Sequence, residues 1–167
     1  RFAGVGNFTL NELRHAQALT TRAIVSVQAE YNLGNRTIEA NLLPYCEEKR
    51  VSLMAYSPFS QGRQAFTDME MAFLEHLAAK YEATVPQVIL SWTISRPSVI
   101  AVTQTMRMEH LRENAMATEK PLQAEDLEGM SQLFARGPVP VPPGRIRLLH
   151  AETPEPSWIY RTREEAL

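Results

Sequence analysis

The feature that most constrains the fold is an alternation of short apolar runs with helical stretches, repeated four times along the 167-residue chain. Runs rich in β-branched and small apolar residues occupy about 1–5, 24–28, 51–56 and 99–102. Each run is followed by apolar residues at helical spacing. Strands that alternate with helices pair in parallel through right-handed crossovers. The pattern therefore predicts an α/β fold with about four parallel β-α units.

Three of the expected helices begin with the same capping pattern, in which a threonine is followed three residues later by Glu or Gln. The threonines are Thr9, Thr67 and Thr84. Pro44 falls inside another helical stretch, so that helix is either kinked or begins late. Residues 59–67 are polar and contain glycine, and we expect a loop there. The expected helices span about 9–20, 38–49, 67–81, 84–94, 109–118 and 125–135.

The end of the chain has a different composition. Six of the 11 prolines lie from Pro138 onward. Proline lacks a backbone donor and excludes helix through most of this segment. We therefore expect one domain over residues 1–137, followed by a proline-rich tail over 138–167.

Composition and charge exclude several classes of function. With 17 basic and 19 acidic residues the net charge is -2, which argues against a nucleic-acid partner. No apolar run approaches the roughly 20 residues that cross a bilayer, so no membrane partner is expected. A single cysteine, Cys46, excludes an internal disulfide and suits the reducing cytoplasm. The histidines lack the spacing of metal ligands, so no metal site is expected.

Individual side chains can also be assigned to the core or to the surface. We expect Cys46 and Trp92 to be buried and His15 and His76 to be exposed. The remaining prediction concerns methionines, which are expected to fill the core at Met69, Met71, Met106, Met108 and Met116.

Four segments, taken in order, resemble the aldo-keto reductase superfamily. They read Gly-Val-Gly-Asn-Phe at 4–8, Gln-Ala-Glu-Tyr-Asn-Leu at 28–33, Ala-Tyr-Ser-Pro-Phe at 55–59, and a closing cofactor motif over 100–114. Each is placed at the carboxyl end of an expected strand, and the resemblance covers about 1–134. The family fold is a (β/α)8 barrel, which typically takes about 250 residues. The resemblance thus implies half of a TIM barrel, its last four β-α units.

The resemblance also implies a nicotinamide cofactor, NADP or NAD. Amides of Asn7 and Gln28 would bond the carboxamide, since an amide offers both donor and acceptor. Tyr56 would stack beneath the nicotinamide, and Ser57 with backbone groups near Phe59 to Gly62 would meet the pyrophosphate. The helix start after Thr105 would hold the adenosine end. The implied cofactor-binding residues are Asn7, Gln28, Tyr56, Ser57, Phe59, Gly62, Gln104, Thr105, Arg107, His110, Glu113 and Asn114.

The sequence departs from the family pattern at two of these positions and at the residue before Asn7. Gly6 stands where a serine is usual, Gln104 where many members carry lysine, and His110 where arginine is frequent. The last two changes weaken anion binding, although Arg107 and Arg112 lie nearby. A preference for NADP over NAD therefore rests on the family alone.

Members of the family reduce carbonyls by hydride transfer, with a tyrosine as general acid. An Asp and a Lys tune the pKa of that tyrosine, and a His orients the substrate. No segment matches these motifs, so no catalytic residue is assigned. One hypothesis is the C-terminal, cofactor-binding portion of a reductase that acts on a small carbonyl. The other is a non-catalytic half-barrel that binds a partner. Unpaired strand edges at 1–5 and 99–102 would favour self-association or a complementing N-terminal half.

Overall fold

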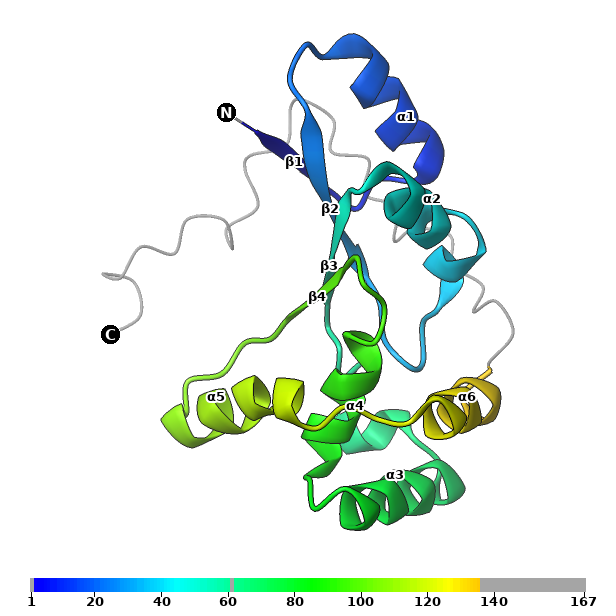
Figure 1. Cartoon of the computed structure of the whole chain (residues 1–167), viewed down its shortest axis with the longest axis vertical. Coiled ribbons are helices and arrows are strands. Elements are labelled where there is room, and N and C mark those ends of the chain that lie inside the picture. The colour runs from blue at the N-terminus through cyan, green and yellow to red at the C-terminus, as the bar shows by residue number, and fades with distance from the viewer. Residues whose placement is uncertain (1, 61, 136–167) are drawn as a thin grey trace.

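The computed structural model describes residues 2–60 and 62–135, and the predicted tail lies outside them. Its centre is a four-stranded parallel sheet with the strand order β1-β2-β3-β4 (Figure 1). The strands are β1 (Ala3–Gly6), β2 (Ile24–Glu30), β3 (Ser52–Tyr56) and β4 (Val99–Val102). The prediction of four parallel β-α units is confirmed.

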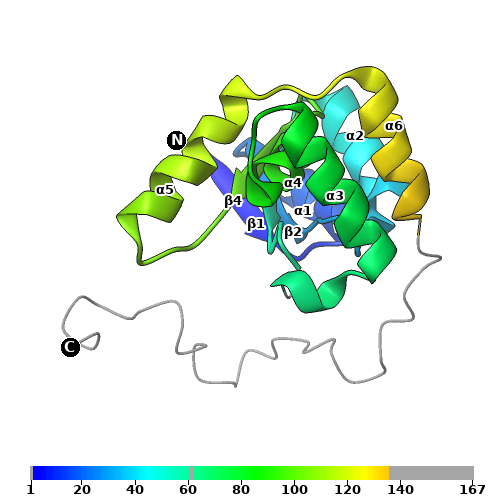
Figure 2. The same cartoon turned by 90° about the horizontal axis from the view of Figure 1, so that it is seen from below.

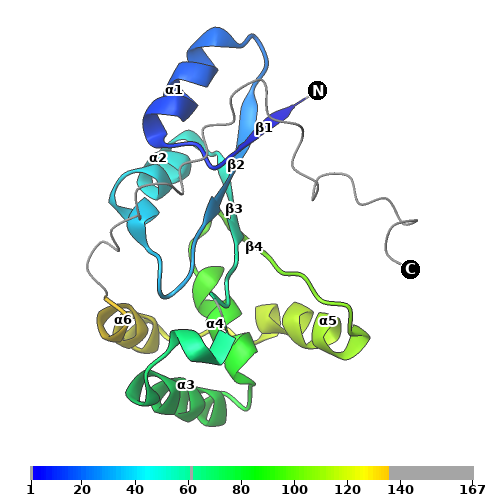
Figure 3. The ribbon, with the colours of Figure 1, turned by 180° about the vertical axis from the view of Figure 1, so that it is seen from behind.

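The helices follow the strands in the predicted alternation. Helices α1 and α2 lie side by side on one side of the sheet (Figures 1 and 3), and α3 packs beside α4 (Figure 2). The α-helices are α1 (Leu10–Leu19), α2 (Leu42–Lys49), α3 (Asp68–Lys80), α4 (Val85–Thr93), α5 (Met108–Ala115) and α6 (Ala124–Leu133). Short 3-10 helices occur at η1 (Thr37–Ala40), η2 (Gly62–Ala65) and η3 (Met116–Glu119).

All three predicted capping boxes form. At the start of α1, the Glu12 amide donates to the Thr9 hydroxyl over 3.3 Å, and the Thr9 amide donates to the Glu12 carboxylate over 2.7 Å. The starts of α3 and α4 repeat this arrangement at Thr67 and Thr84. Each box satisfies backbone donors that a helix N-terminus would otherwise leave unpaired.

The two faces of the sheet differ, and this difference positions the site. Val27 and Leu53 are register partners and both are fully buried beneath the helices. Because side chains alternate along a strand, Gln28 and Met54 point to the opposite face. Side chains on that face are only half-buried or exposed, as Ile100 shows. The helices therefore cover one face of the sheet and leave the face of Gln28 open.

Two strands end the sheet. Among the described residues, β1 pairs with β2 alone and β4 with β3 alone. These are the two edges that the sequence predicts to be unpaired. Each presents a row of backbone donors and acceptors toward any added strand.

Two segments differ from the expected secondary structure. The stretch 38–49 is divided at Asn41 (φ −153°, ψ −50°) into η1 and α2. Pro44 falls in the first turn of α2, where its missing N–H leaves no bond unmade, so the late start is the correct alternative. The stretch 59–67 is not wholly a loop, because it contains η2.

The predictions for individual side chains have mixed outcomes. Cys46 and Trp92 are buried, and His15 and His76 are exposed, as expected. Burial raises the pKa of the Cys46 thiol to about 11, which keeps it protonated. Of the five methionines predicted to fill the core only Met71 is buried, and the prediction is wrong for the other four. Their side chains are exposed: Met69, Met106, Met108 and Met116.

Candidate functional site at the carboxyl ends of the strands

Strands β1 and β3 end with the same backbone change. The residue after β1, Asn7, has φ 58°, and the residue after β3, Ser57, has φ 52°. This left-handed region is uncommon for residues other than glycine, with asparagine an enriched exception. The change turns the chain away from the strand direction at the same edge of the sheet. Two of the predicted site residues therefore occupy the turns themselves.

Three predicted residues lie on adjacent strand ends. The backbone N–H of Asn7 donates to the backbone carbonyl of Gln28 over 2.7 Å, which joins the ends of β1 and β2. Gln28 is the register partner of Met54, and Tyr56 follows Met54 by two residues in β3. Gln28 and Tyr56 therefore share the open face of the sheet. Among the described residues, the side-chain amides of Asn7 and Gln28 have no hydrogen-bond partner, which leaves both available to a ligand.

The half-buried Tyr56 lies beside a carboxylate. Its register partner on β2 is Glu30. Burial, and then the charge of Glu30, raise the pKa of the Tyr56 phenol. A general acid of this type requires a cation that lowers the pKa. The surroundings of Tyr56 therefore favour a role in which its ring stacks against a ligand over a role as proton donor.

The loop after β3 carries the predicted pyrophosphate residues Ser57, Phe59 and Gly62. Two consecutive turns shape it: the Ser60 amide donates to the Ser57 carbonyl, and the Gly62 amide donates to the Phe59 carbonyl, each over 2.9 Å. Gly62 has φ 75°, a conformation that glycine adopts without strain. The buried Ser60 hydroxyl has no partner among the described residues. Sequence reasoning missed this hydroxyl because only the turn geometry distinguishes it from other loop serines.

A second group of predicted residues surrounds the start of α5. The Thr105 hydroxyl accepts the Arg107 amide over 3.1 Å, and Arg107 is the N-cap without a side-chain capping bond. The guanidinium of Arg107 lies 3.2 Å from Glu109, and both side chains are well exposed. Such a surface pair contributes little free energy, so Arg107 can exchange partners readily. Backbone donors in the first turn of α5 and the exposed cation of Arg107 together suit an anion.

The remaining residues of this group have different surroundings. Gln104 and His110 are exposed. The Asn114 amide donates to the Thr103 hydroxyl over 3.5 Å, and the Glu113 carbonyl accepts from Gln87 over 3.0 Å. Asn114 and Glu113 therefore attach α5 to the end of β4 and to α4. The predicted residues thus fall into two groups, one at the ends of β1 to β3 and one at the start of α5, whereas Glu113 and Asn114 lie near the other end of α5.

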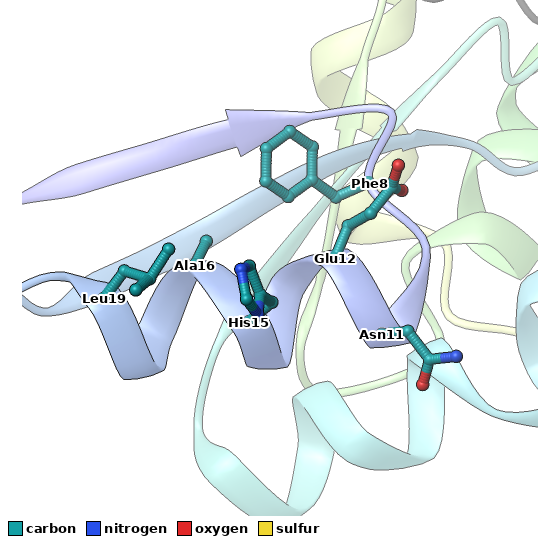
Figure 4. Close-up of a pocket in the computed structure, with 6 residues that line it drawn as sticks. All are labelled: Phe8, Asn11, Glu12, His15, Ala16 and Leu19. Carbon is teal, nitrogen blue, oxygen red and sulfur yellow. The ribbon is translucent and has the colours of Figure 1, made fainter.

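A hollow of about 560 Å³ is lined by Phe8 and by residues of α1 (Figure 4). Figure 4 shows the rings and methyl groups of Phe8, Ala16 and Leu19 toward the strand side of the helix. Leu19 is 74% exposed. The hollow belongs to the helical layer and does not contain Gln28 or Tyr56.

Within the described part of the chain, no group of three or more His, Cys, Asp and Glu side chains is arranged to hold a metal ion. None of the described helices combines the length and the apolar character that spanning a membrane requires.

Comparison with known proteins decides the family. The sequence model described as the Aldo/keto reductase family matches residues 1–134. The chain belongs to the aldo-keto reductase family. Among its relatives is methylglyoxal reductase YeaE of Escherichia coli, 32% identical over 122 residues, with 72% of this chain and 41% of that protein aligned. Pyridoxine 4-dehydrogenase of Escherichia coli is 33% identical over 134 residues, covering 77% of this chain and 44% of that protein.

Solved structures of aldo-keto reductases match the four-stranded fold. The thermostable aldo-keto reductase Tm1743, solved with the inhibitor epalrestat, superposes with a TM-score of 0.75 at 36% identity. A Klebsiella pneumoniae aldo/keto reductase, solved with NADP and acetate, gives 0.70 at 29% identity. Each match covers 80% of this chain and 48% of the other. The aldo-keto reductase chain therefore has the architecture of half a TIM barrel and spans about half the length of these relatives.

Proposed function

We propose that this chain is the cofactor-binding portion of an NAD(P)H-dependent aldo-keto reductase that interconverts a carbonyl and an alcohol. The observation that carries the proposal is the placement of Asn7, Gln28 and Tyr56 on three adjacent strand ends. Solved relatives at 27–29% identity were crystallised with NADP or NADPH. The active sites of TIM-barrel enzymes lie at the carboxyl ends of the strands, where the loops after the strands form them.

The described side chains fit a nicotinamide cofactor. Asn7 and Gln28 offer unpaired amides, and a primary carboxamide needs both a donor and an acceptor. Tyr56 offers a half-buried, neutral ring at the adjoining strand end. The loop from Ser57 to Gly62 and the first turn of α5 would hold the phosphates. When bound, the cofactor supplies or accepts a hydride.

The proton donor is proposed to lie outside these four β-α units. Tyr56 is held neutral by burial and by Glu30, so it is unsuited to give up a proton at neutral pH. The Asp, Tyr, Lys and His that the family uses for catalysis are therefore expected elsewhere in the complete enzyme. The substrate class proposed is a small carbonyl compound. The cofactor is proposed to be NADP, with NAD as the alternative.

The test of this proposal is an equilibrium titration of the chain with NADPH, followed by cofactor fluorescence. Asn7→Ala and Gln28→Ala should each weaken binding about fivefold, because each removes one neutral hydrogen-bonding group. Glu48→Gln, at an exposed residue of α2, is the matched control and should not change the affinity. Absence of NADPH binding by a chain whose circular dichroism shows native helix content would contradict the proposal.

The free sheet edges support a second proposal, a half-barrel that associates with a complementing N-terminal half or with a second copy. Strands β1 and β4 each lack one neighbour among the described residues, and the face of Gln28 is open. The hollow beside α1, with Phe8, Ala16 and Leu19 in its lining, adds an apolar surface for a packing helix. Sedimentation velocity should show dimers or larger species. A monomer that unfolds cooperatively would exclude this second proposal.

Two further expectations complete the proposal. A cytoplasmic location is proposed because the buried, free thiol of Cys46 suits a reducing compartment. We also propose that the family domain ends near residue 137 and that residues 138–167 form a separate tail. Expression of residues 1–137 should then give the same NADPH affinity as the full chain.

A further inference from the structure

We propose that Asn32 is a positioning residue of the cofactor site, which holds the end of β3 in the shape that presents Tyr56 and Ser57. The inference rests on the proposed function, because it assigns Asn32 to the nicotinamide end of that site. Asn32 lies two residues beyond β2 and is 1% exposed. It therefore acts on the cofactor through Ser57 and Glu30, without touching it.

The side chain of Asn32 uses its full hydrogen-bonding capacity. Its Oδ1 accepts from the Gly34 amide over 3.0 Å and from the Asn35 amide over 2.8 Å. Its Nδ2 donates to the Ser57 carbonyl over 3.1 Å and to the Glu30 carboxylate over 3.3 Å. A primary amide has two acceptor lone pairs and two donor hydrogens, so all four are engaged. The acceptor half shapes the turn after β2, and the donor half reaches across to β3.

The donor half acts where the backbone needs support. Ser57 has φ 52°, a left-handed conformation that a serine adopts only at a cost in free energy. Its carbonyl accepts both from Asn32 and from the Ser60 amide, so the two bonds fix the peptide plane between Ser57 and Pro58, directly after the residue that follows Tyr56. Loss of the Asn32 bond would release this turn and the ring that precedes it.

The second donor bond acts on the charge beside Tyr56. Glu30 and Tyr56 are register partners on the open face. The Asn32 amide holds the Glu30 carboxylate at the end of its strand. Asn32 therefore connects both neighbours of the Tyr56 ring, the carboxylate beside it and the turn after it.

The two halves of the side chain can be separated by substitution. Asn32→Asp keeps an oxygen for the Gly34 and Asn35 amides and replaces the donor with a second oxygen, which repels the Ser57 carbonyl. Asn35→Asp is the matched control: it makes the same change in the same turn. Among the described residues, the Asn35 side-chain oxygen accepts only from Thr37, and Asn35→Asp keeps that oxygen. A role confined to the turn would make the two variants alike.

The first measurement is hydrogen exchange of the full chain without cofactor. In Asn32→Asp the Ser60 amide, which donates to the Ser57 carbonyl, should exchange about tenfold faster than in the unsubstituted chain, because the turn opens more often. In Asn35→Asp it should exchange at the original rate. Equal exchange of the Ser60 amide in all three proteins would overturn the inference.

The second measurement compares two ligands. Asn32→Asp should weaken NADPH binding about tenfold, because the turn that presents Tyr56 and Ser57 keeps its binding shape in a smaller fraction of molecules. Binding of 2′,5′-ADP, which lacks the nicotinamide and the pyrophosphate, should be weakened less. An unchanged NADPH affinity, or an equal loss for both ligands, would overturn the role of Asn32. Failure of the unsubstituted chain to bind NADPH would instead refute the proposed function.

A second variant keeps the test decisive where Asn32→Asp melts below the assay temperature. Asn32→Ser retains a short acceptor for the turn and is too short to reach the Ser57 carbonyl. It should show the same faster exchange of the Ser60 amide and the same selective loss of NADPH binding. Original exchange rates in Asn32→Ser would contradict the inference.

Discussion

Gly6→Ser should increase the affinity of the chain for NADPH. Gly6 is the last residue of β1 and the register partner of Gln28, and the family usually carries a serine there. A Cβ at Gly6 would meet no atom within 4 Å, so the new side chain fits without strain. At Gly4, by contrast, a Cβ would lie 2.5 Å from the Ser26 hydroxyl. Addition of a side chain is therefore tolerated at Gly6 for a local, structural reason.

The magnitude follows from one added hydrogen bond. A neutral hydrogen bond to a ligand contributes about 1 kcal/mol, which corresponds to about fivefold in Kd. Gly6→Ala is the control, since it adds the Cβ without the hydroxyl. It should stabilise the fold by ~0.5 kcal/mol through reduced backbone freedom and leave the affinity unchanged. Fluorescence titration with NADPH measures both variants, and equal affinities for the serine and alanine proteins would refute the reasoning.

Three further predictions follow from the described contacts. Tyr56→Ala should weaken NADPH binding by ~2 kcal/mol, about 30-fold, because stacking is lost, whereas Tyr56→Phe should bind as tightly as the original chain. Fluorescence titration compares the two variants, and an equal loss of affinity in both would argue against stacking. Glu30→Gln should lower the pKa of Tyr56, since it removes the negative charge that helps to raise that pKa. An absorbance titration at alkaline pH measures the pKa of the phenol, and an unchanged pKa would contradict the prediction. Phe134→Ala should destabilise the fold by ~3–5 kcal/mol, because Phe134 is fully buried and packs edge-on against Phe66, with 5.6 Å between the ring centroids. Urea unfolding measures the change in free energy of unfolding, and a loss under 1 kcal/mol would contradict the prediction.

Local signals in the sequence were sufficient to predict much of the fold. A capping box depends on residues three apart, so Thr9, Thr67 and Thr84 predict helix starts without knowledge of the tertiary structure. Parallel pairing follows from the alternation of strands and helices. The position of Pro44 left two alternatives, and only the backbone break at Asn41 distinguishes them.

Features that depend on long-range contacts could not be predicted. Exposure of Met69 and Met106 depends on which helix surfaces are covered, and their hydrophobicity alone does not show this. The role of Asn32 depends on the ends of β2 and β3 lying beside each other, since its partner Ser57 is 25 residues away. Family resemblance suggested which residues would bind a cofactor, whereas the supporting role proposed for Asn32 comes only from its packing.

The most direct test of the central claim is an NMR titration of the chain with NADP. The claim is that the strand ends of β1, β2 and β3 form one binding surface. The side-chain amides of Asn7 and Gln28 and the ring of Tyr56 should then shift together and give a single Kd. Shifts confined to the hollow beside α1, or different affinities for the three residues, would contradict it.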